Sequence, residues 1–294
     1  CAPCRSTTIA PNGQVGMAKN KPKSNKSRGK AKLADQADRH ELYEAAVQGV
    51  ESEIDFVEKE FLALRGRRAH SLREDFCGTG NSSCEWVRRR VGNHAIGVDL
   101  DDSVLAWGQQ HHVAGLKPAQ RERIQLLHDD VMTVDTPPQD VVVAMNFSYW
   151  LFKTRDALRD YFKRAHAALI DDGVMFVDCY GGYDAFRELK EKTAHENFTY
   201  VWDQSSYNPV NGEMLCHIHF RFPDGSQMKN AFNYDWRLWT LPEIREILAE
   251  AGFSRSVVYW QGWDEDGETG SGEFDPVESA DADAGWIAYV AALK

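Results

Sequence analysis

Two glycines and two separate carboxylates stand at spacings that could do chemistry. Gly78 and Gly80 lie in the segment LREDFCGTGNSS, residues 72–83, directly after an apolar-to-acidic run. A Gly-x-Gly turn between a strand and a helix lets the backbone approach a ligand, and the helix then offers free N–H groups. Asp99 follows the next apolar run roughly twenty residues later, where a carboxylate can accept hydrogen bonds from ribose hydroxyls. Asp130 ends a third apolar run and could accept from the exocyclic amine of adenine.

The spacing differs in one place from the pattern that binds nicotinamide or flavin dinucleotides. That pattern needs a third glycine where this chain has Ser83. At this point the sequence resembles the class I S-adenosylmethionine-dependent methyltransferases, over roughly Glu41 to Lys294. Members of that family usually show an acidic residue followed by Gly-x-Gly-x-Gly. The segment EDFCGTG, residues 74–80, matches this pattern, with Phe76 in place of the first glycine.

By this resemblance the cofactor is S-adenosylmethionine, and each motif has an expected role. The side chain of Glu74 would reach the amino end of the methionine moiety, while the glycine loop would pass beside its carboxylate. Asp99 would bind the ribose, and Asp130 with Val131 would hold the adenine. The cofactor-binding residues expected in this way are Glu74, Cys77, Gly78, Gly80, Asp99, Leu100, Asp130, Val131, Asn146 and Phe147.

The segment MNFSYWLF, residues 145–152, resembles the fourth-strand motif of the same family, which faces the transferred methyl group. The resemblance implies that Asn146, Phe147 and Tyr149 line the reaction centre, and it makes Asn146 and Tyr149 catalytic candidates. Methyl transfer is an in-line displacement at a sulfonium. The main task of such residues is therefore to align the acceptor atom, the methyl carbon and the sulfur.

The elements that must position these residues follow from the hydrophobic pattern. Apolar residues recur at helical spacing from about residue 36 to 65, which predicts one or two helices before the sheet. Strand-like and helix-like segments then alternate, which predicts an α/β fold with a parallel sheet covered on both faces. The family resemblance implies a doubly wound, mostly parallel seven-stranded sheet with a reversed last strand. The expected divisions are a disordered basic tail (1–34), a Rossmann-like cofactor-binding core (35–196), an insert (197–239) and the completion of the core sheet (240–294).

Residues 197–239 interrupt the alternation with segments in which apolar and polar residues alternate, separated by the turns NPVNG and PDG. We expect an antiparallel sheet here, which relatives with small substrates often use as a lid. On EMLCHIHFRF, residues 213–222, the side chains of His217, His219 and Arg221 share one face. His217 and His219 are candidates for the catalytic base, because a neutral imidazole is available near pH 7. They could also be metal ligands, but a clear third ligand is missing, so no metal is expected.

Aromatic residues concentrate near the insert, where they could hold a cationic acceptor by cation–π attraction or form a small lid core. The loop over residues 263–285 carries many acidic residues and no Lys or Arg, and in this fold it opens on the cofactor side of the sheet. A negative rim there would attract cations, although a solvated acidic loop explains the composition equally well. We therefore expect a small-molecule acceptor that is methylated at an amine nitrogen. The expected substrate-binding residues are Tyr180, Tyr200, Trp202, Tyr234, Trp236 and Arg237.

The net charge of -11 conceals a basic start, because the first 32 residues contain eight Lys or Arg and no acidic residue. The acidic remainder is a poor surface for phosphates, so no nucleic-acid partner is expected. Two alternatives stay open: a protein or RNA methyltransferase that docks through the basic tail, and a non-catalytic cofactor-binding partner subunit. No apolar run approaches the roughly 20 residues that span a bilayer. A cytoplasmic protein without a membrane partner is expected, and a homodimer is left open.

Overall fold

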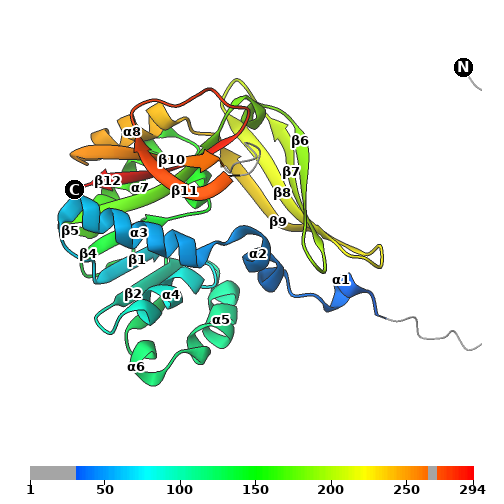
Figure 1. Ribbon diagram of the computed structural model, residues 1–294, viewed down its shortest axis with the longest axis horizontal. Helices are drawn as coiled ribbons and strands as arrows, with labels where there is room; N and C mark the ends of the chain where they lie inside the picture. Colours follow the sequence, from blue (N-terminus) through cyan, green and yellow to red (C-terminus); the bar gives the residue numbers. More distant parts are fainter. Residues whose placement is uncertain (1–30, 264–269) are drawn as a thin grey trace, which may run out of the picture. The chain divides into compact units, whose positions relative to one another are not determined.

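A sheet of eight strands forms the centre of the computed structural model, which describes residues 31–263 and 270–294 (Figure 1). Within these residues the strand order is β11-β10-β12-β5-β4-β1-β2-β3. Neighbours from β3 to β5 pair in parallel, whereas β12 is antiparallel to both β5 and β10. The expected doubly wound, mostly parallel sheet with a reversed last strand is thus confirmed. The strands are β1 (Ser71–Asp75), β2 (His94–Asp99), β3 (Ile124–His128), β4 (Gln139–Ala144), β5 (Leu169–Gly181), β10 (Arg255–Trp263), β11 (Gly270–Val277) and β12 (Trp286–Leu293).

The number of strands differs from the expected seven, because β11 adds an eighth at the edge of the sheet. It comes from the acidic segment that we expected to be a loop, and it pairs antiparallel with β10 from Val258↔Val277 to Trp263↔Gly270. Strands pair through backbone N–H and C=O groups, so a segment without apolar alternation can still join an edge. Residues 264–269 of the expected acidic loop lie outside the described residues.

Helices bury both faces of the sheet, as the alternation of strands and helices predicts. On β4, Val141 and Val143 pack into one core cluster, while Val142 and Ala144 pack into the other. The first cluster contains side chains of α3 and α4, and the second contains side chains of α7 and α8. Burial on both faces explains why the central strands read as continuous apolar runs. The helices around the sheet are α3 (Val50–Arg65), α4 (Asn81–Arg89), α5 (Asp102–His111), α6 (Pro118–Arg121), α7 (Arg155–Ala167) and α8 (Leu241–Glu250).

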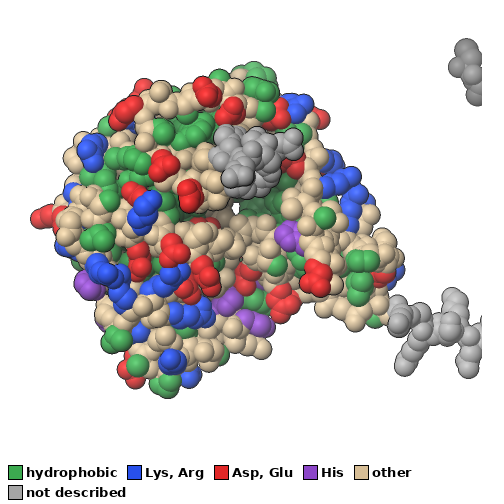
Figure 2. All heavy atoms as spheres, in the orientation of Figure 1, with side chains coloured by type: hydrophobic (Ala, Val, Ile, Leu, Met, Phe, Trp, Pro, Cys, Tyr) green, Lys and Arg blue, Asp and Glu red, His purple; other side chains and the backbone are tan. Residues whose placement is uncertain are grey.

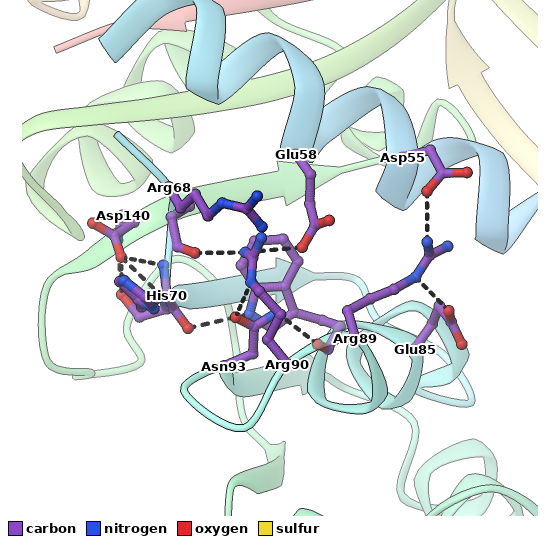
Figure 3. Close-up of polar contacts among 12 residues, drawn as sticks. Asp55, Glu58, Arg68, His70, Glu85, Arg89, Arg90, Asn93 and Asp140 are labelled. Atoms are coloured by element: carbon purple, nitrogen blue, oxygen red, sulfur yellow. Dashed lines mark hydrogen bonds and ion pairs between the residues drawn. The ribbon is translucent and has the colours of Figure 1, made fainter. Parts of the chain in front are cut away.

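Ion pairs fix α3 against α4, beside the start of β1 (Figure 3). Arg89 lies between two carboxylates, with 2.5 Å to Asp55 Oδ1 and 2.6 Å to Glu85 Oε1. The neighbouring Arg90 contacts Glu58 Oε1 at 2.9 Å. Five charged side chains are thus paired where the helix before the sheet meets the first helix after the glycine loop. These contacts hold α3 against the C-terminal end of α4.

A second sheet of four antiparallel strands stands to one side of the central sheet (Figure 1). It begins at Leu189, ahead of the expected boundary at residue 197. Its strands, in the order β6-β7-β8-β9, are β6 (Leu189–Ala194), β7 (Thr199–Tyr207), β8 (Glu213–Arg221) and β9 (Gln227–Arg237). Three short 3-10 turns complete the chain: η1 (Val113–Gly115), η2 (Ser148–Leu151) and η3 (Tyr183–Phe186).

In the described part of the chain, which starts at residue 31, two short helices precede α3 and reach the second sheet. The first, α1 (Leu33–Gln36), is tied to the turn between β8 and β9, because the N–H of Leu33 donates to Asp224 at 2.9 Å. The second, α2 (Arg39–Val47), begins at Asp38, whose side chain accepts from two N–H groups of the first turn. The expected basic tail extends to residue 34, so its end overlaps α1, while residues 1–30 lie outside the described residues.

Candidate active site

The glycine loop connects β1 to α4 through backbone conformations that suit glycine. Gly78 and Gly80 have φ angles of 54° and 69°, in the left-handed region where a side chain is strained. A Cβ atom on Gly80 would also lie 2.7 Å from Leu126 Cδ2. Phe76, which stands at the position of the usual first glycine, has a φ of 58° despite its side chain. The loop therefore turns tightly at the carboxyl end of β1, as a ligand-binding loop requires.

The acidic residue before the loop is buried and engaged with the following helix. Glu74 Oε2 accepts from the N–H of Ser83 at 2.9 Å and from its hydroxyl at 2.5 Å. Burial raises the pKa of Glu74 to about 7, although the bonds from Ser83 act in the opposite direction. Cys77 is also buried, and its N–H donates to the carbonyl of Val98, which joins the loop to β2. The expected contact of Glu74 with the methionine end stays a prediction.

The carboxylates expected to hold the nucleoside lie along the ends of β2 and β3. Asp99 Oδ2 accepts from the N–H of Gly78 at 2.7 Å, so the predicted ribose ligand also holds the glycine loop. Its carbonyl accepts from the N–H of Asp129, which brings the end of β3 alongside. Asp130 accepts from the N–H of Met132 at 2.9 Å and so shapes its own turn. Next to these, Val131 is buried and Leu100 is 64% exposed.

The end of β4 is held by a carboxylate that the sequence did not single out. Asp178 on β5 accepts from the N–H of Asn146 at 2.6 Å and from the N–H of Phe147 at 2.9 Å. Both donors have a φ of 57°, a conformation that costs free energy and is often found at functional sites. Burial raises the pKa of Asp178 to about 7. Tyr149 does not reach the open site, because it is fully buried and its hydroxyl donates to the carbonyl of Asp178.

A cavity of about 390 Å³ opens where the end of β4 faces the second sheet. Asn146 and Phe147 lie at this cavity, as expected for residues near a reaction centre. Its walls are rich in aromatic side chains, and the rings of Tyr234 and Trp236 are stacked with centroids 4.3 Å apart. Five of the six expected substrate-binding residues line it: Tyr180, Tyr200, Trp202, Tyr234 and Trp236.

The sixth, Arg237, lies elsewhere and corrects the sequence interpretation. Its guanidinium carbon lies 3.7 Å from the ring centroid of Trp239, and it pairs with Glu243 Oε1 at 3.0 Å. Arg237 does not line the aromatic cavity; it lines a separate surface pocket beside α7 and α8. Trp239 stacks on the guanidinium of Arg237, and Glu243 neutralises its charge. Arg237 is therefore not available to an acceptor in the cavity.

The two candidate bases are also displaced from the cavity. Ile218, which lies between them on β8, lines the cavity, so His217 and His219 point to the opposite face of the sheet. His219 uses both ring nitrogens there: Nε2 lies 3.0 Å from Asp203 Oδ2, and Nδ1 accepts from the N–H of Asn230. His217 Nδ1 lies 2.6 Å from Asn233 Oδ1. Neither histidine lines the cavity, and their role as catalytic bases stays a prediction.

Several residues that line the cavity were not predicted from the sequence to be site residues. Tyr43 and Val47 come from α2, whose apolar spacing indicated a helix but not its target. Trp286 comes from the start of β12. Asp184 and Glu191 are the charged side chains among the described residues that line the cavity, and no Lys or Arg lines it there. The cavity thus combines aromatic rings with negative charge. On the surface of the molecule that Figure 2 shows, by contrast, acidic and basic side chains are mixed.

Two further properties of residues 31–263 and 270–294 bear on the class of protein. None of the helices in these segments has both the length and the apolar character needed to cross a bilayer. In the same segments, no three His, Cys, Asp or Glu side chains come together in a way that could bind a metal ion.

Comparisons with known proteins identify the fold. No protein-family model matches the chain, and no curated protein sequence matches it either. A solved S-adenosylmethionine-dependent methyltransferase from Clostridium acetobutylicum is similar in structure, with a TM-score of 0.62 and 17% identity over 86% of this chain and 97% of that chain. CalS10, an amino pentose methyltransferase from Micromonospora echinaspora, has a TM-score of 0.61 and 16% identity over 87% of this chain and 96% of that chain. The sugar N-methyltransferase KedS8 from Streptoalloteichus has a TM-score of 0.56 and 16% identity over 93% of this chain and 98% of that chain.

At these identities the likeness defines the fold. The chain has the class I methyltransferase fold that the sequence resemblance implied. The eighth strand, β11, extends the edge beyond the seven strands expected of that fold.

Proposed function

We propose that this protein is an S-adenosylmethionine-dependent methyltransferase that methylates an amine nitrogen of a small molecule. The observation that carries the proposal is the adjacency of two features on one sheet edge. The glycine loop bonded to Asp99 follows β1, and the cavity residues Asn146 and Phe147 follow β4, which pairs with β1. Ligands of parallel α/β sheets bind beyond the carboxyl ends of the strands. A methyl donor in the loop would therefore face an acceptor in the cavity.

The residues at the glycine loop fit the chemistry of this cofactor. It supplies a methyl group on a cationic sulfur, and its methionine end carries an ammonium group. Glu74 is buried close to the loop, and burial raises its pKa to about 7. A nearby ammonium group would favour the ionised carboxylate. The carboxylate of Asp99 keeps lone pairs for hydroxyl donors besides its bond to Gly78. Asp130 and Val131 would hold the adenine.

The cavity supports an amine as the acceptor. Aromatic faces attract cations through their quadrupoles, and the two lining carboxylates, Asp184 and Glu191, add negative charge. Two proteins of similar fold act on amino pentoses or on sugar nitrogen, which supports the same chemistry here. An amine must be neutral to attack, and each pKa unit of deprotonation costs about 1.4 kcal/mol. No histidine is among the described residues that line the cavity, so its proton would leave to water or to a carboxylate.

Two measurements test the proposal in sequence. Isothermal titration with S-adenosylhomocysteine asks whether the cofactor binds, with Asp99→Ala as the variant that should bind it poorly. Methyl transfer from labelled S-adenosylmethionine is then measured with amines, carboxylic acids, phenols and thiols of similar size. Binding followed by turnover of amines supports the proposal. Lack of cofactor binding would exclude the activity altogether, and turnover confined to phenols, thiols or carboxylates would exclude the amine acceptor.

A further inference from the structure

One of the two charged side chains in the cavity lacks a partner. Asp184 Oδ2 lies 2.7 Å from a guanidinium nitrogen of Arg187, so its charge is paired. Glu191 is an exposed residue that lines the same cavity. Among the described residues its carboxylate makes neither an ion pair nor a hydrogen bond, and the charge of Arg187 acts on it only from beyond ion-pair distance. An unpaired carboxylate beside aromatic rings is a site for a cation that comes from outside the chain.

The register of the second sheet places Glu191 within the aromatic wall. Glu191 on β6 lies directly opposite Trp202 on β7, so both side chains project from the same face. The charge of Glu191 also acts on two cavity tyrosines: after burial, it is the next cause that raises the pKa of Tyr200, and it contributes to the raised pKa of Tyr180. The carboxylate therefore faces the space that these rings enclose.

Glu191 is separated from the place where methyl transfer is expected. The ring of Phe147, beside Asn146, lies 6.3 Å from the ring of Trp236. The ring of Trp236 in turn lies 6.3 Å from that of Trp202, the neighbour of Glu191. Two ring-to-ring steps thus lie between the end of β4 and Glu191. A nitrogen aligned for methyl transfer next to Phe147 is therefore not the group that Glu191 contacts.

We propose that Glu191 binds a second, positively charged group of the acceptor, separate from the nitrogen that is methylated. The preferred acceptors are then small diamines, in which one amine lies at the end of β4 and the other, protonated, lies at Glu191. The rings of Trp202 and Trp236 line the chain between them. This inference rests on the proposed function and adds a substrate class and a specificity residue to it.

The test compares two acceptors of equal chain length, pentane-1,5-diamine and pentylamine. Three proteins are measured: wild type, Glu191→Gln, and the control Glu188→Gln, which removes the same charge from an exposed residue outside the cavity lining. Wild type and the control should prefer the diamine in kcat/KM by about tenfold, which corresponds to about 1.4 kcal/mol. Glu191→Gln should reduce this preference to less than about twofold while S-adenosylhomocysteine binds all three proteins equally.

The outcomes separate the two proposals. Loss of kcat/KM by the same factor for both amines in Glu191→Gln, or an unchanged preference, would overturn the role of Glu191. If neither amine is methylated, quenching of tryptophan fluorescence by each amine measures binding directly, because Trp202 and Trp236 line the cavity. A diamine that binds no better than the monoamine, or equally well to Glu191→Gln, would again refute the inference. Failure of the proposed function would appear instead as absent S-adenosylhomocysteine binding.

Discussion

Replacing Asp178 with asparagine tests whether a buried carboxylate holds the end of β4. Its two oxygens accept from the N–H groups of Asn146 and Phe147, and only 7% of the residue is exposed. Burial raises its pKa from the ordinary 3.8 to about 7. The folded chain therefore keeps this proton between pH 4 and 7, where the unfolded chain has lost it. Its contribution to the free energy of unfolding is fully present below pH 4 and is lost as the pH rises through 7.

The size of this effect follows from the shift. About three pKa units at about 1.4 kcal/mol each give roughly 4 kcal/mol as an upper limit. The Asp178→Asn side chain has nearly the same shape but does not titrate. Its free energy of unfolding should therefore rise relative to wild type by about 3 kcal/mol between pH 4 and pH 8. Urea denaturation of both proteins at the two pH values measures this, because linear extrapolation yields the free energy of unfolding in water.

Activity should change in the opposite direction. An asparagine offers one carbonyl oxygen, so one of the two N–H groups loses its acceptor and the strained turn at Asn146 and Phe147 loosens. We expect methyl transfer to fall by about tenfold, with S-adenosylhomocysteine binding changed much less. Asp171→Asn, at an exposed position of the same strand, is the control. An unfolding difference that is equal at pH 4 and pH 8 would refute the burial argument, and unchanged turnover would refute the positioning role.

Three further predictions concern the cofactor, the histidines and the tail. Asp99→Ala should weaken S-adenosylmethionine binding by about 10- to 100-fold in calorimetry, because hydrogen bonds to a charged acceptor contribute about 1.5–3 kcal/mol. Asp102→Ala is the control. Wild-type affinity of the Asp99→Ala protein would exclude the ribose-binding role of Asp99. His217→Ala should leave kcat/KM and its pH profile unchanged, since the ring lies on the face of the second sheet opposite the cavity; a changed pH profile would restore a base role. Deleting residues 1–30 should leave the melting temperature and small-molecule turnover unchanged, because that segment lacks apolar periodicity; lost activity toward a macromolecule alone would favour docking through the tail.

The central sheet was predictable because its strands are apolar on both faces and end at turn or acidic residues. The edge strand β11 was not, since its sequence GSGEFDPV has little apolar alternation and contains a proline. Its pairing with β10 depends on backbone hydrogen bonds, which do not appear in a side-chain pattern. An edge strand needs no buried face, so composition alone indicated a loop.

The alternation along β8 predicted the two faces of the strand but not their surroundings. Met214, Cys216, Ile218 and Phe220 are buried, as their shared apolar character requires. That apolar face turns toward the core and the cavity, because burying it is what holds the second sheet to the domain. The face that carries His217 must then point away. Five of the aromatic residues expected to bind substrate line the cavity for the same reason, because an apolar face brings such side chains together. Their role in binding stays a prediction.

Asp178 and Glu191 escaped sequence reasoning because their meaning depends on pairing between distant strands. Asp178 lies in GVMFVDCY, which reads as a buried strand. Only the parallel pairing of β4 with β5 brings its carboxylate to the N–H groups that follow β4. Glu191 lies in a charged segment that looks like a solvated turn, and its register opposite Trp202 places it in the cavity. A one-residue slip of either register would send the carboxylate that it positions to the other face.

The chemistry of the cavity is coherent without an imidazole. A simple amine with a pKa near 10 costs about 4 kcal/mol to be neutral at pH 7. In a free diamine a second ammonium lowers the pKa of the first, because like charges disfavour a second protonation, but its pairing with Glu191 offsets this effect. Binding that second charge at Glu191 keeps the partner amine at the end of β4, where alignment is the main requirement. The protein thus contributes orientation, while the proton of the attacking amine leaves to water or to a carboxylate.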